Sequence, residues 1–271
     1  MLLQGKKILI TGVLTPQSIA FAVAELCIKE GAEVVLTGFG RGKSLTERSA
    51  KRLSPAPEVL ELDVTKSDDF KALTDSLTKK WGKLDGVLHA VAFAPEDALG
   101  GNFLNTPWES VQTAMRVSAF SLKELAVACK PLMKDGGSIV AIDFDNQSVA
   151  WPIYDWMGVC KAALCAVVRY LARDLGPSKI RVNAVAAGPL STVAAKGIPG
   201  FKALEAGWGK QAPLGWSSKD QDAVARTIAA VLSDLMPSTT GEIIHVDGGY
   251  HAIGAPPVDT AAEKAADPAA T

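Results

Sequence analysis

Histidine, cysteine and net charge are all scarce in this sequence of 271 residues. It contains three histidines and four cysteines, and neither type recurs at the spacings of metal ligands or of Cys-x-x-Cys motifs. The formal net charge is -1, so no global positive field attracts a phosphate backbone. We therefore predict no metal site, buried structural thiols and no nucleic-acid partner.

Long apolar runs are also missing. Stretches such as 23–28 and 223–232 carry charges or fall short of the ~20 residues that a membrane span needs. Near the amino terminus, Lys6 and Lys7 lead directly into a short strand-like run, without the pattern of a secretory leader. The sequence thus predicts a soluble, cytoplasmic protein that makes no membrane contact.

Short apolar runs that alternate with helix-like segments are abundant. Hydrophobic residues make up 48% of the chain, which allows a large core. Continuously apolar strands joined by helical crossovers are typical of a parallel sheet covered on both faces. Strands are predicted at 7–11, 33–37, 59–62, 86–90, 138–142, 180–186 and 242–246. Helices are predicted from Ser18 to about 31, then at 43–53, 67–81, 107–132, 154–175 and 219–235.

The pattern predicts one α/β domain over residues 1–254. We expect a Rossmann-type, doubly wound fold with a seven-stranded parallel sheet and helices on both faces. The segment 255–271 is rich in proline and alanine and is expected to be disordered.

Tyr154 and Lys161 form the pattern that most suggests chemistry. Seven residues are about two turns at ~3.6 residues per turn, so both side chains should leave one face of a helix. A nearby ammonium favours the ionised form of a phenol, and such a phenol can stabilise an oxygen that gains negative charge. An amphipathic core tyrosine beside a solvated lysine is the alternative. The context favours chemistry, because Tyr154 follows the strand 138–142, and ligands of open parallel sheets bind beyond the carboxyl ends of strands.

The turn after the first strand has one glycine, Gly12, where dinucleotide folds usually have Gly-x-Gly-x-x-Gly. Gly12 can still form the tight turn, and Ser18 and Ile19 open a predicted helix whose N-terminus suits a pyrophosphate. An ordinary strand-helix turn fits equally well. After the next two strands, Phe39 could stack on an adenine and Asp63 could bind its edge, or they could be a packing ring and a surface carboxylate.

On these residues the chain resembles the short-chain dehydrogenase/reductase superfamily and, within it, the NADH-dependent enoyl-acyl carrier protein reductases. Most members of the superfamily have the tyrosine and lysine four residues apart and a serine thirteen residues before the tyrosine. This chain has a spacing of seven and Ala141 at that position. Further similar segments are His89-Ala-Val-Ala92, Leu36-Thr-Gly-Phe39, Leu62-Asp-Val64, Ala186-Ala-Gly-Pro189, Thr240-Gly-Glu-Ile-Ile244 and Asp247-Gly-Gly249.

Within this branch the chain is most similar to the actinobacterial, mycolate-type enzymes. Phe144 stands where many bacterial homologues have a second tyrosine, and the resemblance implies that its ring helps to form the substrate pocket. Two features depart from the pattern: Ala90 stands where related enzymes usually carry serine, and the segment 188–208 is shorter than in the mycolate-type enzymes. We expect residues 189–213 to form a mobile substrate lid, and a short lid favours acyl chains of medium length.

The resemblance also implies a set of site residues. Tyr154, Lys161 and Phe144 would be catalytic, with Tyr154 stabilising or protonating the enolate and Lys161 holding the nicotinamide ribose. The implied cofactor-binding residues are Gly12, Ser18, Ile19, Phe39, Asp63, Val64, Ala90, Val91, Ala92, Lys161, Gly188, Pro189, Leu190 and Thr192. The implied substrate-binding residues are Phe93, Phe144, Tyr154 and Met157.

The activity that the resemblance implies is reduction of the trans-2 double bond of enoyl thioesters, the last step of the fatty acid elongation cycle. The substrate would be carried by acyl carrier protein or by coenzyme A, and the enzyme would be a homotetramer. NADH is the expected cofactor, although Arg41 and Lys43 could accept the 2'-phosphate of NADPH. Lys196, Lys202 and Lys210 could face an acidic carrier protein. A short-chain carbonyl or alcohol reductase and a non-catalytic nicotinamide-binding sensor are the alternatives.

Overall fold

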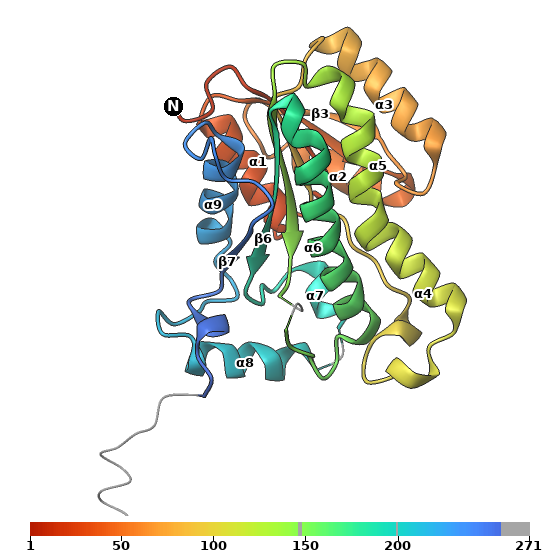
Figure 1. Cartoon of the computed structure of the whole chain (residues 1–271), viewed down its shortest axis with the longest axis vertical. Coiled ribbons are helices and arrows are strands. Elements are labelled where there is room, and N and C mark those ends of the chain that lie inside the picture. The colour runs from red at the N-terminus through yellow and green to blue at the C-terminus, as the bar shows by residue number, and fades with distance from the viewer. Residues whose placement is uncertain (146–147, 199, 256–271) are drawn as a thin grey trace, which may run out of the picture.

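A single parallel sheet of seven strands organises the protein. The computed structural model describes residues 1–145, 148–198 and 200–255 (Figure 1). The strand order is β3-β2-β1-β4-β5-β6-β7, which confirms the predicted Rossmann-type sheet. Apart from residue 255, the predicted disordered tail lies outside the described residues. The strands are β1 (Lys7–Ile10), β2 (Glu33–Gly38), β3 (Glu58–Glu61), β4 (Gly86–His89), β5 (Gly137–Asp143), β6 (Ile180–Ala187) and β7 (Ile243–Val246).

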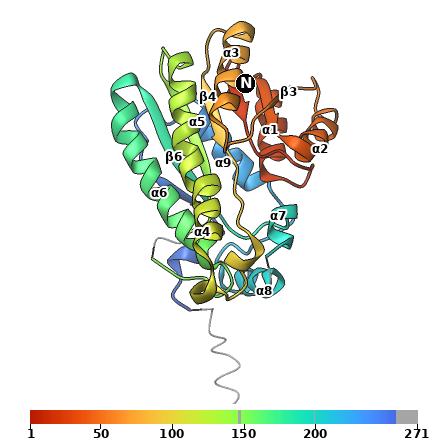
Figure 2. The ribbon, with the colours of Figure 1, turned by 90° about the vertical axis from the view of Figure 1, so that its right-hand side faces the viewer.

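Helices cover both faces of the sheet, as predicted (Figure 2). Successive side chains of a strand point to opposite faces, so Ile8 and Ile10 of β1 join one core cluster and Leu9 joins the other. One face is covered by α1 (Ile19–Lys29), α2 (Gly40–Ala50) and α9 (Asp222–Leu232). The other is covered by α3 (Ser67–Lys80), α5 (Ser121–Cys129) and α6 (Asp155–Leu175), and α4 (Trp108–Met115) packs against α6.

The strand order reverses at β1, which pairs with β2 on one side and with β4 on the other. Ligands of open α/β sheets bind at such a reversal, beyond the carboxyl ends of the strands. The predicted lid folds at this end of the sheet into two helices, α7 (Val193–Lys196) and α8 (Phe201–Gln211) (Figures 1 and 2).

The single helix predicted for 107–132 is interrupted. A π-helical turn, Arg116–Phe120, separates α4 from α5, and a short 3-10 turn, Lys130–Leu132, follows α5. The buried Ser118 lies in the π-helical turn, and its Oγ accepts from the backbone N–H of Phe93 and donates to the carbonyl of Phe93, both at 3.0 Å. The π-helical turn therefore holds the segment after β4 in place. The spacing of apolar residues in the sequence does not indicate this contact.

No helix in the described part of the chain is both long and apolar enough to cross a membrane.

Candidate active site

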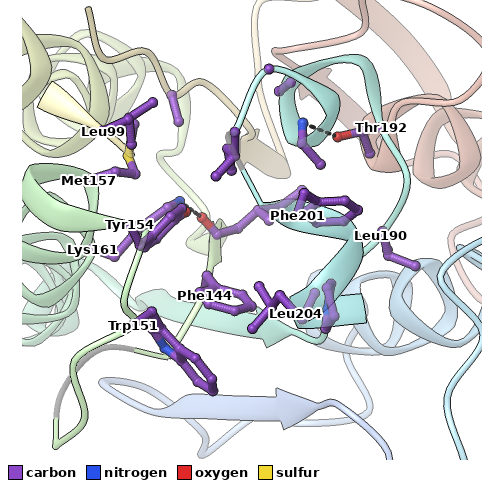
Figure 3. A pocket seen from close by; sticks show the side chains of 18 of the residues that line it. Leu99, Phe144, Trp151, Tyr154, Met157, Lys161, Leu190, Thr192, Phe201 and Leu204 are labelled. Atoms are coloured by element: carbon purple, nitrogen blue, oxygen red, sulfur yellow. Dashed lines mark hydrogen bonds between the residues drawn. The ribbon is translucent and has the colours of Figure 1, made fainter. Parts of the chain in front are cut away.

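The loop that follows β5 carries Tyr154. The helix α6 begins at Asp155, so Tyr154 is its N-cap residue and precedes the first helical residue. Tyr154 and Lys161 nevertheless both line one cavity of about 330 Å³ (Figure 3). That cavity lies beyond the carboxyl end of β5, where the sequence placed it.

Lys161 is fixed in the floor of this cavity. The residue is 5% exposed, and its Nζ donates to the carbonyl of Ile142 at 2.7 Å. Burial lowers the pKa of Lys161, and the neighbouring carboxyl of Asp143 opposes that shift. The Lys161 ammonium thus extends from α6 into the site, and the carbonyl of Ile142 in β5 fixes its orientation.

The surroundings of Tyr154 favour the neutral form of its phenol. Burial raises its pKa above the ordinary value, and the charges of Asp143 and Cys160 raise it further. The net shift is opposite in direction to the one expected from a neighbouring ammonium, because desolvation penalises the phenolate. The Nζ of Lys161 donates to the carbonyl of Ile142. A neutral phenol is a donor of one O–H bond, which suits an oxygen that gains negative charge.

A second cavity, of about 500 Å³, forms a groove at the reversal point of the sheet. The groove and the Tyr154 cavity adjoin, since Ile19, Ala92, Phe93 and Thr192 line both. Among the implied cofactor residues, the groove brings together Gly12, Ser18, Ile19, Phe39, Asp63, Val64, Ala90, Val91, Ala92 and Thr192. The remaining four, Lys161, Gly188, Pro189 and Leu190, line the Tyr154 cavity, as do all four implied substrate residues.

One glycine is sufficient for the turn after β1. Gly12 has a φ of +79°, and a Cβ there would lie 2.0 Å from the carbonyl oxygen of Ala90. Thr11 reinforces the contact, because its Oγ1 accepts from the Ala90 N–H at 2.9 Å and donates to the Leu88 carbonyl at 3.0 Å. The loops after β1 and β4 are thus in direct contact, and only glycine permits that approach.

Ser18 holds the rest of this loop. Its Oγ accepts from the N–H groups of Leu14 at 3.1 Å and Thr15 at 3.0 Å, and it makes no cap bond to α1. The helix α1 begins at Ile19, one residue after the predicted start at Ser18. Both contacts use the oxygen as an acceptor, so its O–H remains a donor for an anion at the start of α1.

Comparison with known proteins identifies the family. A family model described as "Enoyl-(Acyl carrier protein) reductase" matches residues 12–251. The chain belongs to this enoyl reductase family. A Mycolicibacterium smegmatis protein named enoyl-[acyl-carrier-protein] reductase [NADH] is 45% identical over 262 residues, which cover 92% of this chain and 97% of the relative. Proteins of the same printed function from Mycobacterium avium and Rickettsia felis are 43% and 40% identical, covering 92% and 93% of this chain and 97% of each relative.

Aromatic side chains connect the tyrosine of this enoyl reductase to its lid. The ring of Phe144 lies 5.2 Å from that of Tyr154 in an edge-on arrangement and 5.6 Å from that of Trp208 on α8. Trp208 is 3% exposed and stacks on Tyr250 with ring centroids 3.8 Å apart. Phe144 is thus placed as predicted in the cavity wall. Sequence reasoning missed the other rings, since they come from segments without strong periodicity.

Several apolar residues of the enoyl reductase cavity were also missed. They share an origin in the lid or in the loops before Tyr154 and after β4, whose packing the sequence does not signal. These lining residues include Leu99, Trp151, Ile153, Ile198, Phe201 and Leu204 (Figure 3).

Asp63 and Phe39 lie at the far end of the groove. The Oδ1 of Asp63 accepts from the Thr65 N–H at 3.0 Å and from the Thr65 hydroxyl at 2.7 Å. Burial raises the pKa of this carboxyl, but the Thr65 bonds and the charge of Lys66 outweigh it, and the net shift is downward. Asp63 therefore shapes the turn after β3 as well as lining the groove. Phe39 is 51% exposed and lines the groove at the start of α2.

A buried carboxyl lies beside the Tyr154–Lys161 pair. Asp143 is 2% exposed, and its Oδ2 accepts from the thiol of Cys165 at 3.1 Å, while its Oδ1 has no hydrogen-bond partner among the described residues. Burial raises the pKa of Asp143 to about 6, although the charge of Lys161 opposes the shift. The folded enoyl reductase therefore binds this proton more tightly than the unfolded chain does.

We expect Asp143→Asn to flatten the pH dependence of the free energy of unfolding. An unperturbed aspartate titrates near ~3.9, so the stabilisation from the raised pKa is complete below about pH 4 and is lost as the pH rises through 6. A tenfold difference in proton affinity between the folded and unfolded states corresponds to ~1.4 kcal/mol. Urea unfolding of both proteins between about pH 4 and pH 7 measures the difference. The exposed Asp75→Asn serves as control and should follow the wild type; parallel curves for Asp143→Asn would contradict the assignment.

No group of three or more His, Cys, Asp or Glu side chains within residues 1–145, 148–198 and 200–255 is arranged to hold a metal ion. The four cysteines, Cys27, Cys129, Cys160 and Cys165, are free and buried, as expected for structural thiols.

Proposed function

We propose that this enoyl reductase uses NADH to reduce the trans-2 double bond of enoyl thioesters, as the last step of fatty acid elongation in the cytoplasm. One observation supports the proposal most: Tyr154 and the buried Lys161 line an apolar cavity that adjoins a groove at the sheet reversal. The printed names of the relatives, which include both the substrate and NADH, support it.

The chemistry follows from the positions of these side chains. Bound NADH supplies the hydride that the β-carbon of the enoyl group accepts, and negative charge then collects on the thioester oxygen. The hydroxyl of Tyr154 donates to that oxygen and stabilises the transition state more than the ground state. Lys161 would bind the hydroxyls of the nicotinamide ribose, and the apolar wall around Phe144 and Met157 excludes water.

The groove fits a dinucleotide without a 2'-phosphate. Its turn after β1 offers the N–H groups at the start of α1 and the Ser18 hydroxyl to a pyrophosphate. Lys43 is paired with Glu61 at 3.3 Å, and Glu61 also accepts from the Gly40 N–H at 3.1 Å. Neither Arg41 nor Lys43 is among the described residues that line the groove. These contacts support NADH over NADPH.

The test is oxidation of NADH and of NADPH with a medium-chain trans-2-enoyl thioester, alongside a matching 3-ketoacyl thioester. We expect turnover on the enoyl substrate with NADH, and a value of kcat/KM at least about 10-fold lower with NADPH, because a single ionic contact is worth roughly that factor. Turnover on the ketoacyl substrate alone would move the protein to the carbonyl reductases. Binding of NADH without turnover of either substrate would support the sensor alternative.

The lid supports a preference for medium-length acyl chains. Phe201 and Leu204 of α8 line the cavity and close it on the side opposite Tyr154 (Figure 3). In the same assay, a series of thioesters from octenoyl to hexadecenoyl should show its highest kcat/KM below hexadecenoyl. Activity restricted to chains longer than hexadecenoyl would contradict this preference.

Exposed lysines on the lid support an acidic carrier protein as the partner. Lys196, Lys202 and Lys210 are all exposed, whereas Glu205, the one acidic residue of α8, accepts from the hydroxyl of Ser218. Coenzyme A thioesters remain an alternative form of the substrate. Exposed apolar residues on α5 and α6, among them Val127 and Val159, support the expected homotetramer.

A further inference from the structure

The residue after Tyr154 has an unusual backbone. Asp155 has a φ of +41°, one of two positive values among the non-glycine residues that the structure describes. Aspartate tolerates this region better than most residues, but the conformation persists only where the surroundings impose it. Such strain lies directly beside the catalytic phenol, at the first residue of α6.

The carboxylate of Asp155 binds a distant loop. Its Oδ2 accepts from the N–H of Gly101 at 2.6 Å and from the N–H of Asn102 at 3.0 Å. Two backbone donors on one ionised oxygen are charge-assisted bonds, which are shorter and stronger than neutral ones. The loop and α6 are thereby joined across more than fifty residues of sequence.

The other neighbours of Tyr154 hold the same loop. The carbonyl of Ile153 accepts from the N–H of Gly100 at 3.1 Å. Trp156 stacks on Phe103 with ring centroids 4.8 Å apart, and its Nε1 donates to the carbonyl of Phe103 at 3.1 Å. Residues 153, 155 and 156 therefore bind residues 100–103, and Tyr154, which lies between them, lines the cavity together with Ile153.

The loop itself forms part of the cavity wall. Leu99 lines the cavity beside Met157 (Figure 3). It also packs with Tyr154 against a small buried cluster that contains Met157 and Cys160. Asp155 therefore connects the part of the cavity wall that carries Leu99 to the backbone next to Tyr154.

We propose that Asp155 is a positioning residue for the reaction: its carboxylate binds the 101–102 backbone and thereby fixes the hydroxyl of Tyr154 against the acyl pocket. The inference rests on the proposed function, since it assigns a role to Asp155 in that same site. Misplacement of a reacting group by about 1 Å can cost about 10²-fold in rate. Lys161 lies two turns further along α6 and is held by Ile142, so the effect falls on kcat and leaves NADH affinity unchanged.

Three substitutions separate the carboxylate from the backbone strain. Asp155→Asn keeps an acceptor oxygen and tolerates a positive φ, so kcat should stay within about 3-fold of the wild type. Asp155→Ala loses the acceptor, and Asp155→Gly loses the acceptor but relieves the strain; both should lower kcat about 10-fold or more, with an unchanged Kd for NADH. Wild-type kcat in Asp155→Gly would overturn the proposal, because the backbone alone would then matter.

A double-variant cycle tests whether the effect acts through Tyr154. In a Tyr154→Phe background, Asp155→Ala should cause no further loss of kcat, since the hydroxyl that Asp155 positions is gone. Losses that multiply would overturn the proposal. Asp97→Ala is the matched control: it removes an exposed carboxylate of the same region that binds Ser110 and not α6. Its kcat should equal that of the wild type.

Amide hydrogen exchange supplies a readout that does not depend on activity. The N–H groups of Gly101 and Asn102 should exchange faster in Asp155→Ala and Asp155→Gly than in the wild type and in Asp155→Asn. Equal exchange rates in all four proteins would show that Asp155 does not hold the loop and would overturn the proposal. If the wild type fails to reduce enoyl thioesters, the proposed function fails, and the exchange experiment still decides whether Asp155 holds the loop.

Discussion

Tyr154→Phe should lower kcat for an enoyl thioester about 10²-fold or more, since deletion of one donor to a developing oxyanion has a cost of that size. Phenylalanine keeps the ring that packs edge-on against Phe144, so the cavity wall and the fold should be preserved. The Kd for NADH should not change. Steady-state kinetics at saturating NADH, together with a fluorescence titration of NADH, separate the two quantities.

The matched control is Tyr170→Phe. Tyr170 lies on the same helix but is 62% exposed and remote from the lining of either cavity. Its kcat should equal that of the wild type. If Tyr154→Phe also turned over at the wild-type rate, Tyr154 would have no part in the mechanism.

Lys161→Ala should raise the Kd for NADH at least about 10-fold. A hydrogen bond from a charged donor contributes ~1.5–3 kcal/mol, which corresponds to about 10- to 100-fold in affinity. Removal of the ammonium also leaves Asp143 without the positive charge that opposes the upward shift of its pKa, so this carboxyl should titrate at a still higher pH. Calorimetric titration with NADH measures the first effect.

Lys161→Met distinguishes the lost charge from the lost volume, since methionine fills most of the same space. Both Lys161 variants should bind NADH weakly, whereas the exposed Lys71→Ala should bind it as the wild type does. Unchanged NADH affinity in Lys161→Met would rule out the role of Lys161 at the ribose.

Local patterns predicted the sheet well, and they drew attention to Tyr154 and Lys161. The central strands β1, β4 and β5 are largely apolar because helices cover both faces of the sheet, and Tyr154 and Lys161 line one cavity. Gly12 was predicted to form the tight turn after β1 because it is the one glycine there, and glycine readily adopts a positive φ. These features depend on neighbours in sequence, which periodicity and turn chemistry describe.

The features that sequence did not predict depend on contacts between distant segments. The pKa of Tyr154 rises because burial penalises the phenolate, and burial follows from packing that no spacing reveals. The two bonds of Asp155 to residues 101–102 require the loop after β4 to approach α6. The π-helical turn at Arg116–Phe120 likewise depends on Ser118 meeting Phe93.

The two ends of α8 are held in different ways. Near its carboxyl end, Trp208 lies between Tyr250 and the backbone of Gly188, and its Nε1 donates to the Asp247 carbonyl at 2.9 Å. At its amino end, the helix starts from Gly200 with a φ of +77°, and Phe201 covers the cavity. Phe201 therefore closes the cavity at the end of α8 that lies away from the Trp208–Tyr250 stack. The size of the side chain at position 201 should therefore set how much space the cavity offers on its α8 side.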